Sequence, residues 1–221
     1  MSDHRSRVAD PNERLDQVMA LYLEKDRNGD SCHEIKRAYS AIHDCERIQR
    51  EVERLVVEFP NNERILMANA VLQLEAGKRD KAQLSLDQLL SMPGAHPEAA
   101  ILRSQLAVQE GNTARARKLL QQQIVLRPDY AELRETLAAV YYLEGKYAQA
   151  RNALSAAGRL GASGWRIAYH EGLIREATQD WEGACQMYIS ATDQKPDFVQ
   201  AMSRLVGLTE HQECRRVADR R

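Results

Sequence analysis

The chain has 221 residues, of which 43% are hydrophobic and 29% are charged, which is enough apolar material for one large globular core or two small ones. Its 31 basic and 32 acidic residues give a net charge of −1, so the electrostatic attraction needed for general binding to nucleic acid or anionic membranes is missing. The sequence contains no run of about 18 apolar residues, so we expect no membrane insertion.

The first predicted helix covers residues 10–26, with Asp10 as its cap and Pro11 as its first residue. Its apolar stripe consists of Leu15, Val18, Met19 and Tyr22. Before this helix, no apolar stretch follows the basic N-terminal residues, as a secretory signal would require. With Met1 as the native start, a cytoplasmic location is therefore expected.

Residues 31–59 are predicted to be helical up to Phe59 and Pro60. They form either one long helix or a degenerate helix pair with its turn at His43, and we favour the pair. The polar residues from Glu210 onward are expected to fray.

Metal binding is not predicted for the two segments that invite it. Glu24–Gly29 resembles the first half of an EF-hand loop, but Ile35 stands where the loop needs a bidentate glutamate. Cys32 and His33 are separated from His43 and Cys45 by about 15 Å if the residues between them are helical, which is too far for one zinc ion or for a Cys32–Cys45 disulfide. Together with Cys185 and Cys214, these cysteines are expected to be free thiols in a reducing compartment.

A period of 34 residues runs through the middle of the chain. Gly77, Gly111 and Gly145 are spaced by it, and Gln179 holds the next place. An alanine column and three apolar columns follow the same step: Ala82, Ala116, Ala150 and Ala184; Leu86, Leu120, Leu154 and Tyr188; Ile65, Ala99, Leu133 and Ile167; Leu72, Leu106, Val140 and Ile174. The glycine suits a tight turn between two helices, and the alanine lets the helices approach closely. The pattern therefore predicts an all-α chain of repeated helix pairs.

Polar residues are placed to cap several of these helices. Asn112 and Asp180 precede second helices. Asp129 with Glu132, and Asp197 with Gln200, have the spacing of a capping box.

Residues 131–164 resemble the tetratricopeptide-repeat (TPR) consensus almost column by column. The matching residues are Ala131, Leu137, Ala138, Tyr141, Gly145, Tyr147, Ala150, Leu154 and Ala157, with Ala162 where proline is usual. The other units depart from it, since Asn69 and Gln73, then Arg103 and Ala107, and then Glu171 and Arg175 occupy the usual leucine and tyrosine places.

The resemblance implies an α-solenoid of stacked TPR helix pairs wound as a right-handed superhelix. The N-terminal helices would take residues 1–62, and four units would follow over 63–196, as 63–96, 97–130, 131–164 and 165–198, with an overlap at the end. A capping helix over 197–210 would shield the last unit with Phe198, Met202, Leu205 and Leu208, leaving 211–221 as a polar tail.

In TPR proteins the second, fifth, ninth and twelfth places of each unit usually face the concave groove. These places hold Arg64, Met67, Val71, Leu74, Glu98, Ile101, Gln105, Val108, Glu132, Glu135, Ala139, Tyr142, Arg166, Tyr169, Leu173 and Glu176. From them we predict a partner-binding groove of Arg64, Met67, Val71, Ile101, Gln105, Glu135, Tyr142, Arg166 and Tyr169. His170 could also face this groove, although a solvated histidine is the commoner outcome. Because Met67, Ala68 and Val71 replace polar residues, the carboxylate clamp of TPR co-chaperones does not carry over.

The resemblance favours a non-catalytic adaptor or scaffold that binds a protein or peptide segment, without cofactor or metal. Two alternatives stay open: a chaperone for secreted or cell-envelope assembly proteins, and the regulatory arm of an enzyme acting in trans. The patterns leave the partner unidentified, and a homodimer is a further alternative. The sequence shows no Gly-x-Ser-x-Gly elbow and no phosphate-binding loop, so no catalysis is predicted.

Overall fold

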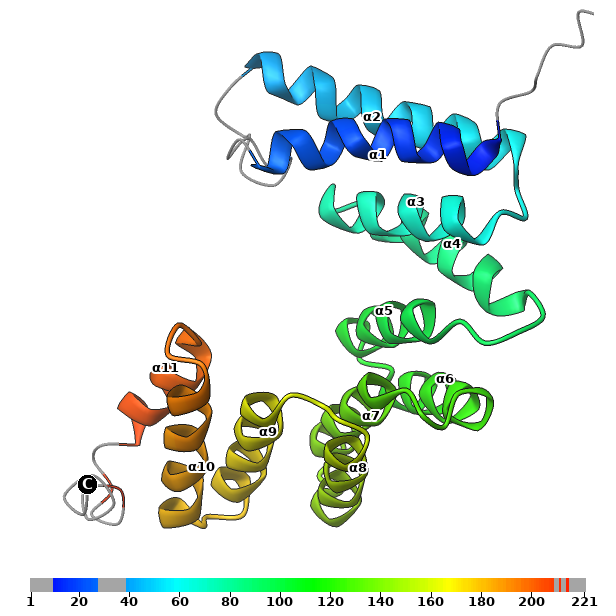
Figure 1. Cartoon of the computed structure of the whole chain (residues 1–221). Helices are drawn as coiled ribbons and strands as arrows, with labels where there is room; N and C mark the ends of the chain where they lie inside the picture. Colours follow the sequence, from blue (N-terminus) through cyan, green and yellow to red (C-terminus); the bar gives the residue numbers. More distant parts are fainter. Residues whose placement is uncertain (1–9, 28–38, 209–210, 212–213, 215–221) are drawn as a thin grey trace, which may run out of the picture. The chain divides into compact units, whose positions relative to one another are not determined.

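The computed structural model describes residues 10–27, 39–208, 211 and 214, with only the backbone of 22–27 and 39–44 (Figure 1). This part of the chain contains no strand and folds into the following helices. They are α1 (Pro11–Arg27), α2 (Tyr39–Glu58), α3 (Glu63–Glu75), α4 (Arg79–Ser91), α5 (Pro97–Gln109), α6 (Thr113–Leu126), α7 (Ala131–Leu143), α8 (Tyr147–Arg159), α9 (Gly164–Ala177), α10 (Trp181–Gln194) and α11 (Val199–Gly207).

The helices form successive pairs within two compact units, Met1–Pro93 and Gly94–Arg221. In the first unit α1 pairs with α2 and α3 with α4, and α3 packs on α2. In the second unit α5 pairs with α6, α7 with α8 and α9 with α10, and the first helices of neighbouring pairs also touch. The predicted all-helical fold of stacked pairs is therefore confirmed.

Left-handed residues make the turn inside four of the pairs. Gly77, Gly111 and Gly145 have φ values of 73°, 76° and 71°. Gln179 takes the same conformation, with a φ of 62°, although it carries a Cβ. The glycine column thus reflects a backbone requirement that Gln179 meets at a conformational cost.

The alanine column lies at the packed interface of each pair. Ala82, Ala116, Ala150 and Ala184 are all completely buried. The apolar residues four places further along, from Leu86 to Tyr188, are buried with them. Small and large side chains therefore alternate along the second helices, as close packing of a helix pair requires.

Three of the predicted helix caps are present, at the starts of α1, α6 and α10. The side chains of Asn112 and Asp180 accept hydrogen bonds from Arg115 N at 2.9 Å and Gly183 N at 3.0 Å, and Asp10 accepts one from Asn12 N at 2.9 Å.

The two predicted capping boxes are wrong. The residues that cap α7 and α11 are Tyr130 and Phe198, each one place after the predicted cap, Asp129 or Asp197. Asp129 is left outside α7, and its carboxylate pairs with Arg127 at 3.2 Å.

Polar residues at consensus leucine and tyrosine places form a buried network in the first unit. Asn69 donates to Ser85 Oγ of α4 at 2.8 Å, and Gln73 donates to Glu53 Oε1 of α2 at 2.9 Å. These bonds tie α3 to both of its neighbours, so polar replacements here are compatible with the fold.

The N-terminal segment is a helix pair of its own, but it differs from the predicted one. α2 is helical without interruption through His43, so the turn predicted there is wrong. Its partner is α1, whose Leu15 is buried with Ile48, Val52 and Ile65. Ile48 occupies the repeat's alanine place, which makes α2 the second helix of this pair.

The last helix, α11, packs on α9 and α10 through Ala201, which is buried against Ala168 and Ala191, and through the residues at its two ends. Phe198 packs edge-on against Trp165 and Tyr169, with ring centroids 4.7 and 4.9 Å away, and Leu208 is buried. Met202 is 41% exposed, so its predicted place in the apolar stripe is wrong.

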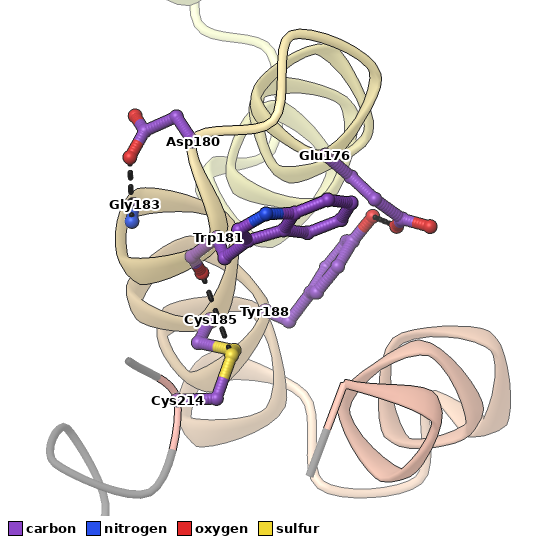
Figure 2. Close-up of a disulfide and its surroundings, with 7 residues drawn as sticks. All are labelled: Glu176, Asp180, Trp181, Gly183, Cys185, Tyr188 and Cys214. Atoms are coloured by element: carbon purple, nitrogen blue, oxygen red, sulfur yellow. Dashed lines mark hydrogen bonds between the residues drawn. A yellow bond between two sulfur atoms is a disulfide. The ribbon is translucent and has the colours of Figure 1, made fainter. Parts of the chain in front are cut away.

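A disulfide joins Cys185 of α10 to Cys214, with Cα atoms 5.6 Å apart (Figure 2). Both cysteines are buried, and the Cys214 sulfur lies 3.5 Å from the carbonyl oxygen of Trp181. His211 stacks on the Trp181 ring at 4.2 Å. At these residues the prediction of a fraying tail is therefore wrong.

The prediction of free thiols is wrong as well. Besides Cys185 and Cys214, Cys45 is disulfide-bonded. Cys32, like the second half of the EF-hand-like loop, lies outside the described residues.

We expect Gln179→Gly to raise the free energy of unfolding by about 0.5–1 kcal/mol. A left-handed residue with a Cβ costs about 1–2 kcal/mol, and part of this gain is offset by the greater freedom of glycine in the unfolded chain. The reciprocal control, Gly145→Gln, should lower stability. Thermal melting measures both, and a Gln179→Gly variant less stable than the parent would contradict the account.

Replacing both Cys185 and Cys214 by alanine should lower the free energy of unfolding by about 2–4 kcal/mol, because the cross-link no longer restricts the unfolded chain. The oxidised parent is the reference, and peptide mass mapping checks that its Cys185–Cys214 bond is intact. Equal melting curves for the variant and the oxidised parent would show that the bond does not hold the C-terminal residues in place.

Candidate functional site

A cavity of about 340 Å³ opens in the second unit, on the side formed by the first helices α5, α7 and α9. Because one helix of each of three consecutive pairs contributes, the cavity is a product of the repeat stacking. Its lining residues are Ser104, Gln105, Val108, Gln109, Glu135, Thr136, Ala139, Val140, Leu143, Arg166 and His170.

Most of the surface of this cavity is apolar, although seven of its eleven lining residues have polar or charged side chains. Val108, Ala139, Val140 and Leu143 supply the apolar surface. Leu143 is 54% exposed. An apolar hollow with a few converging polar groups is the usual form of a binding site.

Glu135 is the buried charge of the cavity, with only 4% of its side chain exposed. Arg166 of α9 donates from Nε to Glu135 Oε1 at 2.7 Å, and His170 Nε2 lies 3.4 Å from the same oxygen. The other oxygen, Oε2, is buried and has no hydrogen-bond partner among the described residues.

The pKa of Glu135 is set by opposing effects. Burial favours the neutral acid, but the hydrogen bond from His170 and the charge and hydrogen bond of Arg166 outweigh it and hold the pKa below its usual value. Glu135 is therefore a carboxylate at neutral pH. A buried carboxylate oxygen without a donor is costly, so the cavity is suited to a guest that brings one.

The structure brings three of the predicted groove residues to this cavity. Gln105, Glu135 and Arg166 line it, together with Val108 and Ala139 from the wider set of groove places.

Other predicted residues from the second unit do not line the cavity. Ile101 is half-buried on α5, and Tyr142 packs against the cluster of Ala138 and Leu154. Tyr169 packs against Tyr188, with ring centroids 5.9 Å apart, as well as on the end of α11. These aromatic residues make structural contacts within the unit.

The remaining predicted groove residues belong to the first unit. Arg64 of α3 pairs with Asp16 of α1 at 2.7 Å, while Met67 and Val71 are half-buried on α3. The first helix thus engages part of the face that was predicted for a partner. A single groove that includes both units stays a prediction.

The predicted groove set leaves out several residues that line the cavity, among them Gln109, Leu143 and His170, although His170 was named as a residue that could face the groove. Each stands four places after a groove residue that also lines it: Gln105, Ala139 and Arg166, respectively. Residues four apart share a helix face, so extending the groove places by one turn would have found them.

The described part of the chain contains no group of three or more His, Cys, Asp or Glu residues that could hold a metal ion. None of its helices is both long and apolar enough to span a bilayer.

Comparisons with known proteins agree with the repeat pattern. A family model for the tetratricopeptide repeat matches residues 107–164. No curated protein matches the sequence.

Similar solved structures come from several proteins. A thermophilic TPR protein in Thermus thermophilus aligns with a TM-score of 0.65 and 19% identity, covering 90% of this chain and 98% of that one. MamA from Desulfovibrio magneticus aligns with a TM-score of 0.61 and 13% identity, covering 84% and 97%. YrrB, a TPR protein with an unusual peptide-binding site, aligns with a TM-score of 0.57 and 14% identity, covering 86% and 98%. At these identities the likeness concerns the fold alone.

We expect Arg166→Leu to raise the pKa of Glu135, because it removes a group that holds the carboxylate in its charged form. It should also lower the free energy of unfolding by about 1–3 kcal/mol, since a buried charge loses a hydrogen bond. The carbon-13 shift of the Glu135 carboxyl during a pH titration measures the pKa. Arg134→Leu is the control, because Arg134 donates to the Pro128 carbonyl and not to Glu135. An unchanged Glu135 pKa in Arg166→Leu would contradict the assigned pairing.

Proposed function

Because the chain is a tetratricopeptide-repeat protein, we propose that it is a non-catalytic adaptor that binds a segment of another protein in the cavity of α5, α7 and α9. The observation that carries this proposal is the position of the cavity, which lies on the first helices of three consecutive pairs. These helices carry the groove in the repeat family.

The chemistry of the cavity supports binding rather than catalysis. Its buried carboxylate, Glu135, is held by Arg166 and His170, and its pKa is lowered rather than raised toward neutrality. A general acid or base works best with a pKa near the working pH. Glu135 is therefore better suited to recognising a hydrogen-bond donor than to moving a proton.

A second candidate function is supported by the disulfide between Cys185 and Cys214. Disulfides persist mainly in oxidising compartments, so this bond speaks against the cytoplasmic location expected from the N-terminus. An oxidising compartment favours a chaperone for secreted or cell-envelope assembly proteins. On this view the same cavity would hold a client segment instead of a permanent partner.

Two further roles would use the same binding face. The regulatory arm of an enzyme acting in trans would bind that enzyme there, and a homodimer would place a second copy of the chain in the cavity. No specific contact in the described part of the chain favours either role over an adaptor. Sedimentation of the purified protein would reveal a second copy as a dimer.

The proposal is tested by filling the cavity with a side chain. Peptides that bind the full chain are first selected from a random display library. Ala139 is half-buried in the cavity lining, so Ala139→Arg should weaken peptide binding at least tenfold, or about 1.4 kcal/mol. Ala148→Arg is the matched control, since Ala148 is exposed on α8, outside the cavity, and this variant should bind like the parent.

Calorimetry on the two variants separates binding from folding, because both should melt cooperatively near the parent temperature. If Ala139→Arg binds the peptides as tightly as the parent does, the cavity is not the binding site and the proposal fails.

A further inference from the structure

We propose that the cavity accepts a tyrosine or tryptophan side chain of the partner segment, whose donor group binds the unpartnered oxygen of Glu135. This inference rests on the proposed function and specifies the chemistry of the partner. It follows from the size, the walls and the hydrogen-bond vacancy of the cavity.

The size suits an aromatic ring. The cavity measures about 340 Å³. A buried apolar cavity of about 150 Å³ is enough to hold benzene, so a ring with a polar group and its linking carbon fits in the space available here.

The walls favour a side chain that is apolar along its body. Val108 of α5 and Ala139, Val140 and Leu143 of α7 would contact the ring. Tyrosine and tryptophan combine such a body with one donor at the far end, and they dominate binding energy at many interfaces.

The polar end of the cavity calls for a donor. Glu135 Oε1 is already engaged by Arg166 and His170, whereas Oε2 is buried with no partner in the described part of the chain. Oε2 is shielded from water in the free chain, so the carboxylate has to turn about its last, soft torsion before an entering O–H or N–H group can reach this oxygen. Arg166, whose side chain is 40% exposed, has to move with Oε1 as it turns.

Charge selects a neutral donor over a cation. The carboxylate of Glu135 is matched by the guanidinium of Arg166, 2.7 Å away. A lysine or arginine from the partner would add a second positive charge beside Arg166, and an acidic side chain would face the Glu135 carboxylate. A phenol or an indole satisfies Oε2 without disturbing this balance.

The test uses small probes on the full chain with methyl-labelled valine and leucine. We expect 4-methylphenol, the tyrosine side chain, to shift the methyl resonances of Val108, Val140 and Leu143. It should bind about tenfold more tightly than 4-methylanisole, which has the same ring but no donor. Butylamine, the lysine side chain, should bind more weakly than 4-methylphenol.

A variant assigns the preference to Glu135. In Glu135→Gln the advantage of 4-methylphenol over 4-methylanisole should fall to about threefold or less, because the charged acceptor is gone. The probe comparison on the parent chain does not depend on this variant, so it stands even if Glu135→Gln unfolds. In any selected peptide whose tyrosine binds in the cavity, exchanging that tyrosine for phenylalanine should likewise lower affinity about tenfold.

The outcomes separate this inference from the proposed function. Equal binding of the two ring probes, or tighter binding of butylamine, would overturn the aromatic-donor assignment. If none of the probes shifts the cavity methyls while Ala139→Arg still blocks the selected peptides, the inference fails and the proposed function survives. If Ala139→Arg has no effect on the peptides, both fail.

Discussion

The close crossing of the two helices in each pair is the constraint on which the rest of the structure depends. The fully buried alanines of the second helices allow that approach, and larger residues such as Leu120 and Leu154 fill the space beside them. A single pair cannot bury its apolar faces alone, so pairs must stack. In the second unit this stacking sets α5, α7 and α9 next to one another in order, and the cavity lies along them.

The carboxylate of Glu135 is the exception to this apolar packing. A charge with 4% of its side chain exposed requires compensation, and α9 provides it through Arg166 and His170. That compensation reaches one carboxylate oxygen and leaves the other without a donor from the described residues. The free molecule thus retains a buried carboxylate oxygen without a donor, and this is the group that the proposed partner would satisfy.

Much of the fold was accessible from the sequence, because the period of 34 residues reports backbone and packing requirements directly. The turn glycines, the buried alanine column and the caps Asn112 and Asp180 are local features, and the structure confirms them. The turn at His43 was mispredicted because His43 and Ile48 stand at the turn and alanine places of the repeat, although both lie inside one continuous helix. The Cys185–Cys214 bond was missed because spacing alone does not reveal which distant residues meet.

Only part of the cavity lining could be predicted from the sequence. The repeat places identify Gln105, Glu135 and Arg166 as groove residues. Which groove residues line a cavity depends on how neighbouring helix pairs pack, and the repeat pattern does not report that.

On the proposed function, a partner segment completes the hydrogen bonding of Glu135 inside the cavity. A crystal structure of the full chain with a selected peptide would show whether it does. We expect a tyrosine hydroxyl or a tryptophan N–H about 2.6–3.0 Å from a Glu135 carboxylate oxygen, with the ring against Val108 and Val140. A peptide bound elsewhere, or bound here with Oε2 of Glu135 still lacking a donor, would contradict it.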